Sequence, residues 1–222
     1  MPKILIVVTS HGQLDAEHAT GLWLDEYAVP RRAFHEAGFD VVTASPHGGQ
    51  APIDPRSLEG ASPDQDAMVA LRETITIGEA GDAADYDAIF FPGGHGTMFD
   101  LATNEPVKTL LSEFDAQGKV VAAVCHGPAA FVDAISATDP TRLLVHGRRI
   151  TAFTDSEERA VHLDTAVPFL LASKLREQGA TVVENADWAD HVEVDGNLVT
   201  GQNPQSSAST ANAVIELLKA RV

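Results

Sequence analysis

Cysteine, basic residues and long apolar runs are all scarce in this chain of 222 residues. Its single cysteine, Cys125, excludes an internal disulfide and favours a reducing, cytoplasmic compartment. Only 15 Lys and Arg accompany 32 Asp and Glu, and the resulting net charge of −17 repels phosphate backbones and anionic lipids. No apolar run reaches the roughly 18 residues that span a bilayer, and the run over residues 4–8 is too short for a signal-peptide core. We therefore expect a protein without nucleic-acid or membrane partners.

Several cofactor and metal motifs are also missing. The nine histidines show neither the H-E-x-x-H pattern nor another paired ligand spacing, so no zinc site is predicted. The G-x-G-x-x-G dinucleotide fingerprint and the Walker phosphate loop are absent as well. The sequence thus predicts no metal and no cofactor.

Apolar runs alternate with helical patterns along the chain. The runs at residues 3–8, 40–44, 88–91 and 119–124 end in turns and are apolar on both faces, as buried parallel strands are. Helices are predicted at residues 26–37, 105–117 and 128–136. This order indicates an α/β fold, a flavodoxin-like three-layer sandwich whose mostly parallel sheet carries helices on both faces.

The remaining segments complete a single predicted domain over residues 1–222. A surface loop is expected over residues 45–61, and helices within residues 156–178 and 206–220. Short strands are expected at residues 149–152 and 181–183. A hairpin of residues 191–194 and 197–200 should turn at Asp195-Gly196. We find no linker that would divide the chain.

Cys125 stands at a sharp turn between a predicted strand and a predicted helix. The apolar strand ends at this residue, and Pro128 suits the first turn of the helix that follows. This geometry is that of a nucleophile elbow. The N–H groups of the following helix should stabilise a thiolate and lower the thiol pKa. We therefore interpret Cys125 as a catalytic or redox-sensing cysteine rather than a structural one.

A second turn, rich in glycine, follows the predicted strand that ends at Phe91. Gly93 and Gly94 allow backbone N–H groups to approach a ligand closely, as in an oxyanion cradle. Both turns lie at the carboxyl ends of parallel strands, where α/β proteins bind ligands. Among 32 acidic residues, Glu26 and Glu158 are candidate acids, although most such residues are simply solvated.

Two motifs carry a resemblance to a known family: FPGGHGT at residues 91–97 and AAVCHGP at residues 122–128. They resemble the PfpI superfamily of class I glutamine-amidotransferase-like proteins. The stretches ITAFTD (150–155), DGNLVTGQNP (195–204) and SAST (207–210) resemble its branch of glutathione-independent glyoxalases. Members of this branch are also called glyoxalase III or D-lactate dehydratase, and they double as stress chaperones. The similarity covers nearly the whole chain.

The resemblance implies a set of site residues. Its nucleophile falls on Cys125, its adjoining histidine on His126, the acid of its first helix on Glu26 and its third triad acid on Glu158, with the neighbouring Glu157 as the alternative. The glycine turn, Gly93 and Gly94, together with the N–H of His126, would bind substrate and its oxyanion. Residues 45–72, which should help wall the pocket, depart from the family pattern except at Ile53, Asp54 and Pro55, so the resemblance does not assign the substrate preference.

Three functions are compatible with these residues. The resemblance implies conversion of methylglyoxal or glyoxal to D-lactate or glycolate through a hemithioacetal on Cys125, with a small aldehyde as partner and a homodimer as assembly. The same cysteine with His126 and Glu158 could instead serve a peptidase or small-amide hydrolase. A third reading is a holdase chaperone or oxidation sensor. We rank the glyoxalase first.

Overall fold

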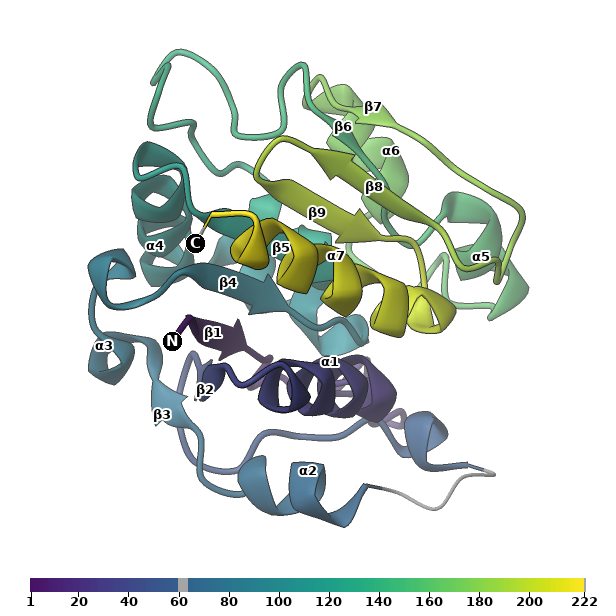
Figure 1. Ribbon diagram of the computed structural model, residues 1–222. Coiled ribbons are helices and arrows are strands. Elements are labelled where there is room, and N and C mark those ends of the chain that lie inside the picture. The colour runs from purple at the N-terminus through teal and green to yellow at the C-terminus, as the bar shows by residue number, and fades with distance from the viewer. Residues whose placement is uncertain (60–63, 222) are drawn as a thin grey trace.

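The computed structural model describes residues 1–59 and 64–221, and a seven-stranded sheet runs through its centre (Figure 1). The strand order is β3-β2-β1-β4-β5-β9-β8, and every neighbouring pair is parallel except the β8–β9 hairpin. The strands are β1 (Lys3–Val7), β2 (Asp40–Ser45), β3 (Ile75–Thr76), β4 (Ala88–Phe91), β5 (Val120–Val124), β8 (Val192–Asp195) and β9 (Leu198–Gly201). The predicted mostly parallel sheet is confirmed.

Helices cover both faces of this sheet. In β1, Ile4 and Ile6 belong to one apolar cluster, which includes residues of α1 (Leu24–Glu36) and α7 (Ser207–Lys219). Leu5 and Val7, which point the opposite way, belong to the cluster that contains α4 (Glu105–Ala116). Figure 1 shows α1 and α7 side by side on one face and α4 on the other. Burial on both faces explains why the strands read as continuous apolar runs.

Smaller elements surround the sheet. They are α2 (Gln65–Ala70), α3 (Ile77–Ala80), α5 (Asp155–Ala160), α6 (Leu171–Glu177) and a separate two-stranded parallel sheet of β6 (Arg149–Ile150) and β7 (Thr181–Val182). The capping box of α5 pairs Thr154 with Glu157 and places Glu158 in the first turn of that helix.

Several predicted boundaries were wrong. The helix expected over residues 128–136 is only a five-residue 3₁₀ turn, Gly127–Phe131. The hairpin turns at Gly196-Asn197, because Asp195 already pairs with Leu198. The expected surface loop contains the fully buried Asp54, which caps a 3₁₀ turn, Pro55–Leu58. Residues 60 and 61 at the end of that loop, and residue 222 of the predicted domain, lie outside the described residues.

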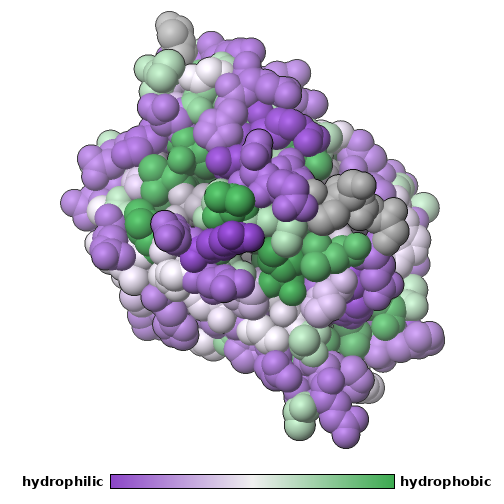
Figure 2. Space-filling model, turned by 90° about the horizontal axis from the view of Figure 1, so that it is seen from below, coloured by the Kyte–Doolittle hydropathy of each residue, from purple (hydrophilic) through white to green (hydrophobic). Residues whose placement is uncertain are grey.

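One face of the surface is predominantly hydrophilic. Figure 2 views the molecule from below, where hydrophilic residues cover most of the face and hydrophobic ones form separate patches. Over residues 1–59 and 64–221, no helix combines the length and the apolar character that crossing a membrane requires.

Candidate functional site

Cys125 occupies a strained position directly after β5. Its φ angle is +59°, a left-handed conformation that costs a residue with a side chain on the order of 1–3 kcal/mol. Two backbone hydrogen bonds hold it there: its N–H donates to Gly201 at 3.0 Å, and its carbonyl accepts from Phe153 at 2.9 Å. The residue is only 3% exposed. The structure therefore has a sharp elbow at Cys125, with the sulfur at the carboxyl edge of the sheet, although a 3₁₀ turn takes the place of the predicted helix.

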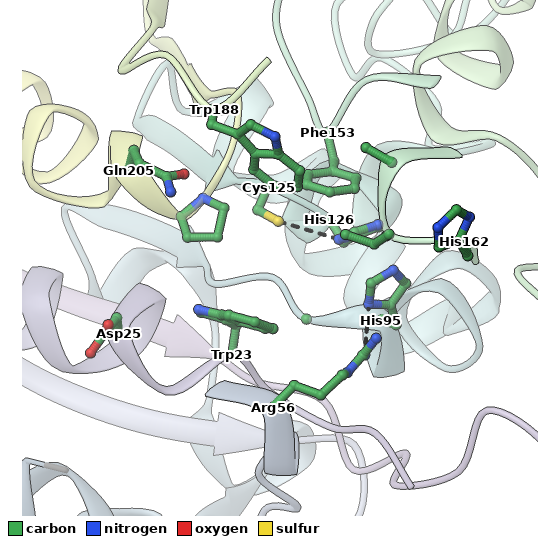
Figure 3. Close-up of a pocket in the computed structure, with 14 residues that line it drawn as sticks. Trp23, Asp25, Arg56, His95, Cys125, His126, Phe153, His162, Trp188 and Gln205 are labelled. Atoms are coloured by element: carbon green, nitrogen blue, oxygen red, sulfur yellow. Dashed lines mark hydrogen bonds between the residues drawn. The ribbon is translucent and has the colours of Figure 1, made fainter. Parts of the chain in front are cut away.

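His126 connects the sulfur to a buried carboxylate. Its Nδ1 lies 3.3 Å from Cys125 Sγ (Figure 3). Its Nε2 lies 2.7 Å from Oε2 of Glu158. Burial alone would raise the pKa of Glu158, but the facing histidines lower it well below its usual range. An ionised carboxylate only accepts hydrogen bonds, so Nε2 of His126 carries the hydrogen. Nδ1 then presents a lone pair to the thiol and can take its proton.

Glu26 lies on the other side of the sulfur. It is fully buried near the start of α1, and its Oε2 accepts the N–H of Gly93 at 2.7 Å. The carboxyl group also interacts with the Cys125 thiol, while Oε1 makes no other hydrogen bond within the part of the chain described. Burial raises the pKa of Glu26 to about 8. At neutral pH this carboxyl is therefore mostly protonated and able to donate to the sulfur.

The expected lowering of the Cys125 pKa was wrong. Burial, followed by the neighbouring Glu26, raises the pKa of this thiol. The predicted helix would have opposed this effect, but a five-residue 3₁₀ turn supplies little of a helix dipole. The resting group is thus a thiol, and its attack on a substrate requires His126 to accept the proton.

The backbone N–H groups of the glycine turn have two different roles. The N–H of Gly93 is occupied by Glu26 and is therefore not free to bind an oxyanion, contrary to expectation. A side chain at Gly93 would place its Cβ 2.5 Å from the nitrogen of His126. Among the described residues, the N–H groups of Gly94 and His126 make no hydrogen bond, and both residues line the cavity in front of the sulfur. These two donors form a candidate oxyanion hole.

The cavity has a volume of about 660 Å³ and aromatic walls. Phe153 and Trp188 lie on one side of it and Trp23 on the other (Figure 3). The centroid of the Phe153 ring lies 4.4 Å from that of the His126 ring, and the two rings are tilted by 35°. Because Cys125 is almost completely buried behind this wall, electrostatic interactions near the sulfur are stronger than they would be in water.

Comparison with known proteins identifies the family. A model of the DJ-1/PfpI family matches residues 16–217. The chain belongs to this family. It is 34% identical to the glutathione-independent glyoxalase HSP31 of Saccharomyces cerevisiae over 98% of both chains. It is 32% identical to the glutathione-independent glyoxalase hsp3101 of Schizosaccharomyces pombe, over 97% of this chain and 95% of the relative.

A solved structure supports the same assignment. The crystal structure of glyoxalase III from Candida albicans matches with a TM-score of 0.85 and 29% identity, over 97% of this chain and 96% of that one. The resemblance drawn from the sequence motifs, and the fold that it implies, are therefore confirmed.

The two neighbouring acids of this DJ-1/PfpI chain point in different directions. Glu158 faces His126, whereas Glu157 is fully buried in a separate network. Oε1 of Glu157 accepts the backbone N–H of Trp188 at 2.8 Å and the side-chain N–H of Asn203 at 2.8 Å. Glu158 is thus the acid placed to act on His126, and Glu157 holds the wall that carries Trp188.

Sequence reasoning missed two polar residues of the cavity, His95 and Arg56. His95 Nε2 lies 2.7 Å from Oε1 of Glu158, and Arg56 Nη2 lies 3.3 Å from Nδ1 of His95. Nitrogen and oxygen atoms of His95, His126 and Glu158 all lie within 4.8 Å of one another, a spacing that a metal ion could also use. One signal was present in the sequence, because His95 stands inside the glycine turn.

Proposed function

We propose that this protein is a glutathione-independent glyoxalase that converts methylglyoxal or glyoxal to D-lactate or glycolate. The full-length relatives named as glutathione-independent glyoxalases support this activity. The observation that carries it in the structure is Glu26. A hydrolase needs only the cysteine, histidine and third acid, whereas a glyoxalase must also move a proton between two carbons. A buried carboxyl beside the sulfur with a pKa of about 8 is suited to that transfer.

The reaction begins with addition of the cysteine to the aldehyde. His126 takes the thiol proton as Sγ of Cys125 bonds to C1, which gives a hemithioacetal. The aldehyde oxygen gains the negative charge and is stabilised by the N–H groups of Gly94 and His126. No cofactor is needed for this step.

The second stage moves a hydrogen and releases the acid. The C1 hydrogen leaves as a proton, and a proton is delivered to C2, so that the hemithioacetal becomes a thioester of the 2-hydroxy acid. Glu26 and His126 flank the sulfur and are the groups assigned to carry these protons. Water then hydrolyses the thioester, so that one aldehyde and one water yield one hydroxy acid and the free thiol.

One assay tests the proposed function directly. Purified protein is incubated with methylglyoxal in the absence of glutathione, and D- and L-lactate are measured separately with stereospecific detection. We expect D-lactate to accumulate in proportion to methylglyoxal consumed. Absence of lactate, together with release of free amine from peptides or small amides, would show that the site is a hydrolase instead.

The different settings of the two neighbouring acids predict different defects. We expect Glu158→Gln to lower kcat about 100-fold with a folded protein, because an amide cannot accept from both histidines or stabilise a charged His126. Glu157→Gln should instead lower the free energy of unfolding by about 1–3 kcal/mol, because an NH2 group replaces one carboxylate oxygen and leaves either the Thr154 N–H or the donors at Oε1 without an acceptor. Steady-state kinetics and urea unfolding measure the two effects, and exchange of the two phenotypes would reverse the assignment.

Three further features of this protein are proposed together with this activity. We propose that residues 1–222 form one domain, which is supported by a sheet built from strands spread between residues 3 and 201. We also propose a homodimer in the cytoplasm, as the family resemblance and the single cysteine suggest.

A further inference from the structure

The Glu158 carboxylate is shared between two histidines. Its Oε2 accepts from His126, and its Oε1 accepts from His95, each at 2.7 Å. Glu158 is 2% exposed, and His95 is 4% exposed. In a dry setting, each oxygen of a carboxylate needs a donor, and the direction of those donors fixes the rotation of the group. His95 therefore supplies one of the two imidazole hydrogen bonds that orient the Glu158 carboxylate.

The second nitrogen of His95 is also directed. Arg56 Nη2 lies 3.3 Å from Nδ1, and because a guanidinium only donates hydrogen bonds, Nδ1 must be the acceptor. The hydrogen of His95 then resides on Nε2, where it faces Glu158. Burial lowers the pKa of His95 to about 4, so this ring is neutral near pH 7 and has a single hydrogen to place.

Arg56 is itself held in position. Its Nε donates to Oδ1 of Asp54 at 2.9 Å and its Nη2 to Oδ2 at 2.5 Å. Asp54 is fully buried and also accepts the hydroxyl of Thr20 at 2.8 Å. A bidentate pair of this kind restricts a guanidinium to one orientation. A chain of directed hydrogen bonds thus runs from Asp54 through Arg56 and His95 to Glu158.

We propose that His95 is a positioning residue, which holds the Glu158 carboxylate in the one orientation that also accepts the Nε2–H of His126. Arg56 extends this support into residues 46–59, outside the two glycine-containing turns. The inference rests on the proposed function, because its effect is expressed through proton transfer from Cys125 to His126. His95 makes no contact with Sγ and takes no proton in the reaction.

This arrangement predicts a change in pH dependence as well as in rate. Without the His95 N–H, the Glu158 carboxylate has His126 as its single imidazole partner. The carboxylate then favours the protonated imidazole of His126 more strongly. We therefore expect the acidic limb of the kcat/KM profile to move to higher pH. The charged and titratable groups around this pair are Cys125, Glu26, His95, Arg56, Asp54 and Glu157, together with Asp25 and His162 at the cavity wall.

The test compares His95→Phe with His95→Gln. We expect His95→Phe to lower kcat about 10- to 100-fold, with KM changed less than about threefold, and to shift the acidic limb upward. His95→Gln restores a donor to Glu158 and should recover activity to within about threefold, with the limb near its original position. A defect in packing alone would lower the amount of folded protein without moving the limb.

His191→Phe is the matched control. His191 makes a histidine–glutamate contact with Glu193 at 3.0 Å and is absent from the cavity lining. We expect unchanged kcat and pH profile. Arg56→Lys tests the chain from its other end and should lower kcat about 3- to 10-fold, with a shift of the same sign. If neither His95 variant folds, the kcat and pH profile of Arg56→Lys test the inference in their place.

Three outcomes would overturn the inference. They are a His95→Phe enzyme with normal kcat and pH profile, a His95→Gln enzyme as defective as His95→Phe, and inactivation of the wild type by EDTA with recovery on adding zinc. The last would make His95, His126 and Glu158 a metal site. Failure of the proposed function appears separately, as absence of lactate formation by the wild type or retention of turnover by Cys125→Ser.

Discussion

Cys125→Ser should lower kcat/KM at least 100-fold, a barrier increase of about 2.7 kcal/mol. A serine hydroxyl holds its proton far more tightly than a thiol, so an attacking alkoxide is much harder to generate at this position than a thiolate, even with Nδ1 of His126 only 3.3 Å from the native sulfur. The fold should survive, because the hydroxyl is smaller and the backbone bonds to Gly201 and Phe153 do not involve the side chain. Lactate formation and thermal unfolding measure the two expectations.

The single cysteine provides an independent control for this substitution. Cys125 is the only thiol that iodoacetamide can alkylate, so the fraction modified at this residue, measured by peptide mass, reports on one sulfur. Activity of the wild type should fall in proportion to that fraction. Retention of more than about a tenth of kcat/KM by Cys125→Ser, or full activity after complete alkylation, would exclude Cys125 as the nucleophile.

Glu26→Gln should lower turnover about 100-fold while preserving the fold and the reactivity of Cys125 toward iodoacetamide. The amide keeps the shape of the side chain and an acceptor for the Gly93 N–H, but it cannot exchange a proton. Glu36→Gln, an exposed change on the same helix, is the control and should leave kinetics unchanged. Normal turnover by Glu26→Gln would remove the proton-carrier role and, with it, the main structural support for a glyoxalase.

The same substitution should make the protein more stable at alkaline pH. The folded state binds the Glu26 proton up to a pKa of about 8, whereas the unfolded chain releases it near 4.5. Between these values the unfolded state binds fewer protons, so the wild type loses stability as pH rises. Glu26→Gln lacks this loss, and its advantage should grow from little near pH 4.5 to a few kcal/mol at pH 8. Urea unfolding at both pH values checks the sign, and an advantage that did not grow with pH would contradict the buried, protonated carboxyl.

Local patterns were sufficient for the central part of the fold. The runs that became β1, β4 and β5 are apolar at nearly every position because their side chains alternate between two buried faces, whereas β2, nearer the sheet edge, is only partly buried and keeps polar residues. The short elements were harder to predict. The helix expected after Cys125 stops at Phe131, and β6 lies outside the main sheet, because packing against other segments decides such short pieces.

Sequence alone predicted the position of the proposed nucleophile and, through family motifs, proposed His126, Glu26 and Glu158 as its partners. Tertiary structure alone decided the electrostatics of the site. Gly93 donates to Glu26 across 67 residues, and His95 donates to Glu158 across 63. A pattern of neighbouring residues indicates whether a side chain is buried. The pKa of that side chain and the atom that carries its hydrogen depend on which groups, distant in sequence, are buried beside it. For this reason the thiol pKa rises where the local motif predicted a fall, and the hydrogen-bond chain from Asp54 to Glu158 becomes visible only in the folded chain.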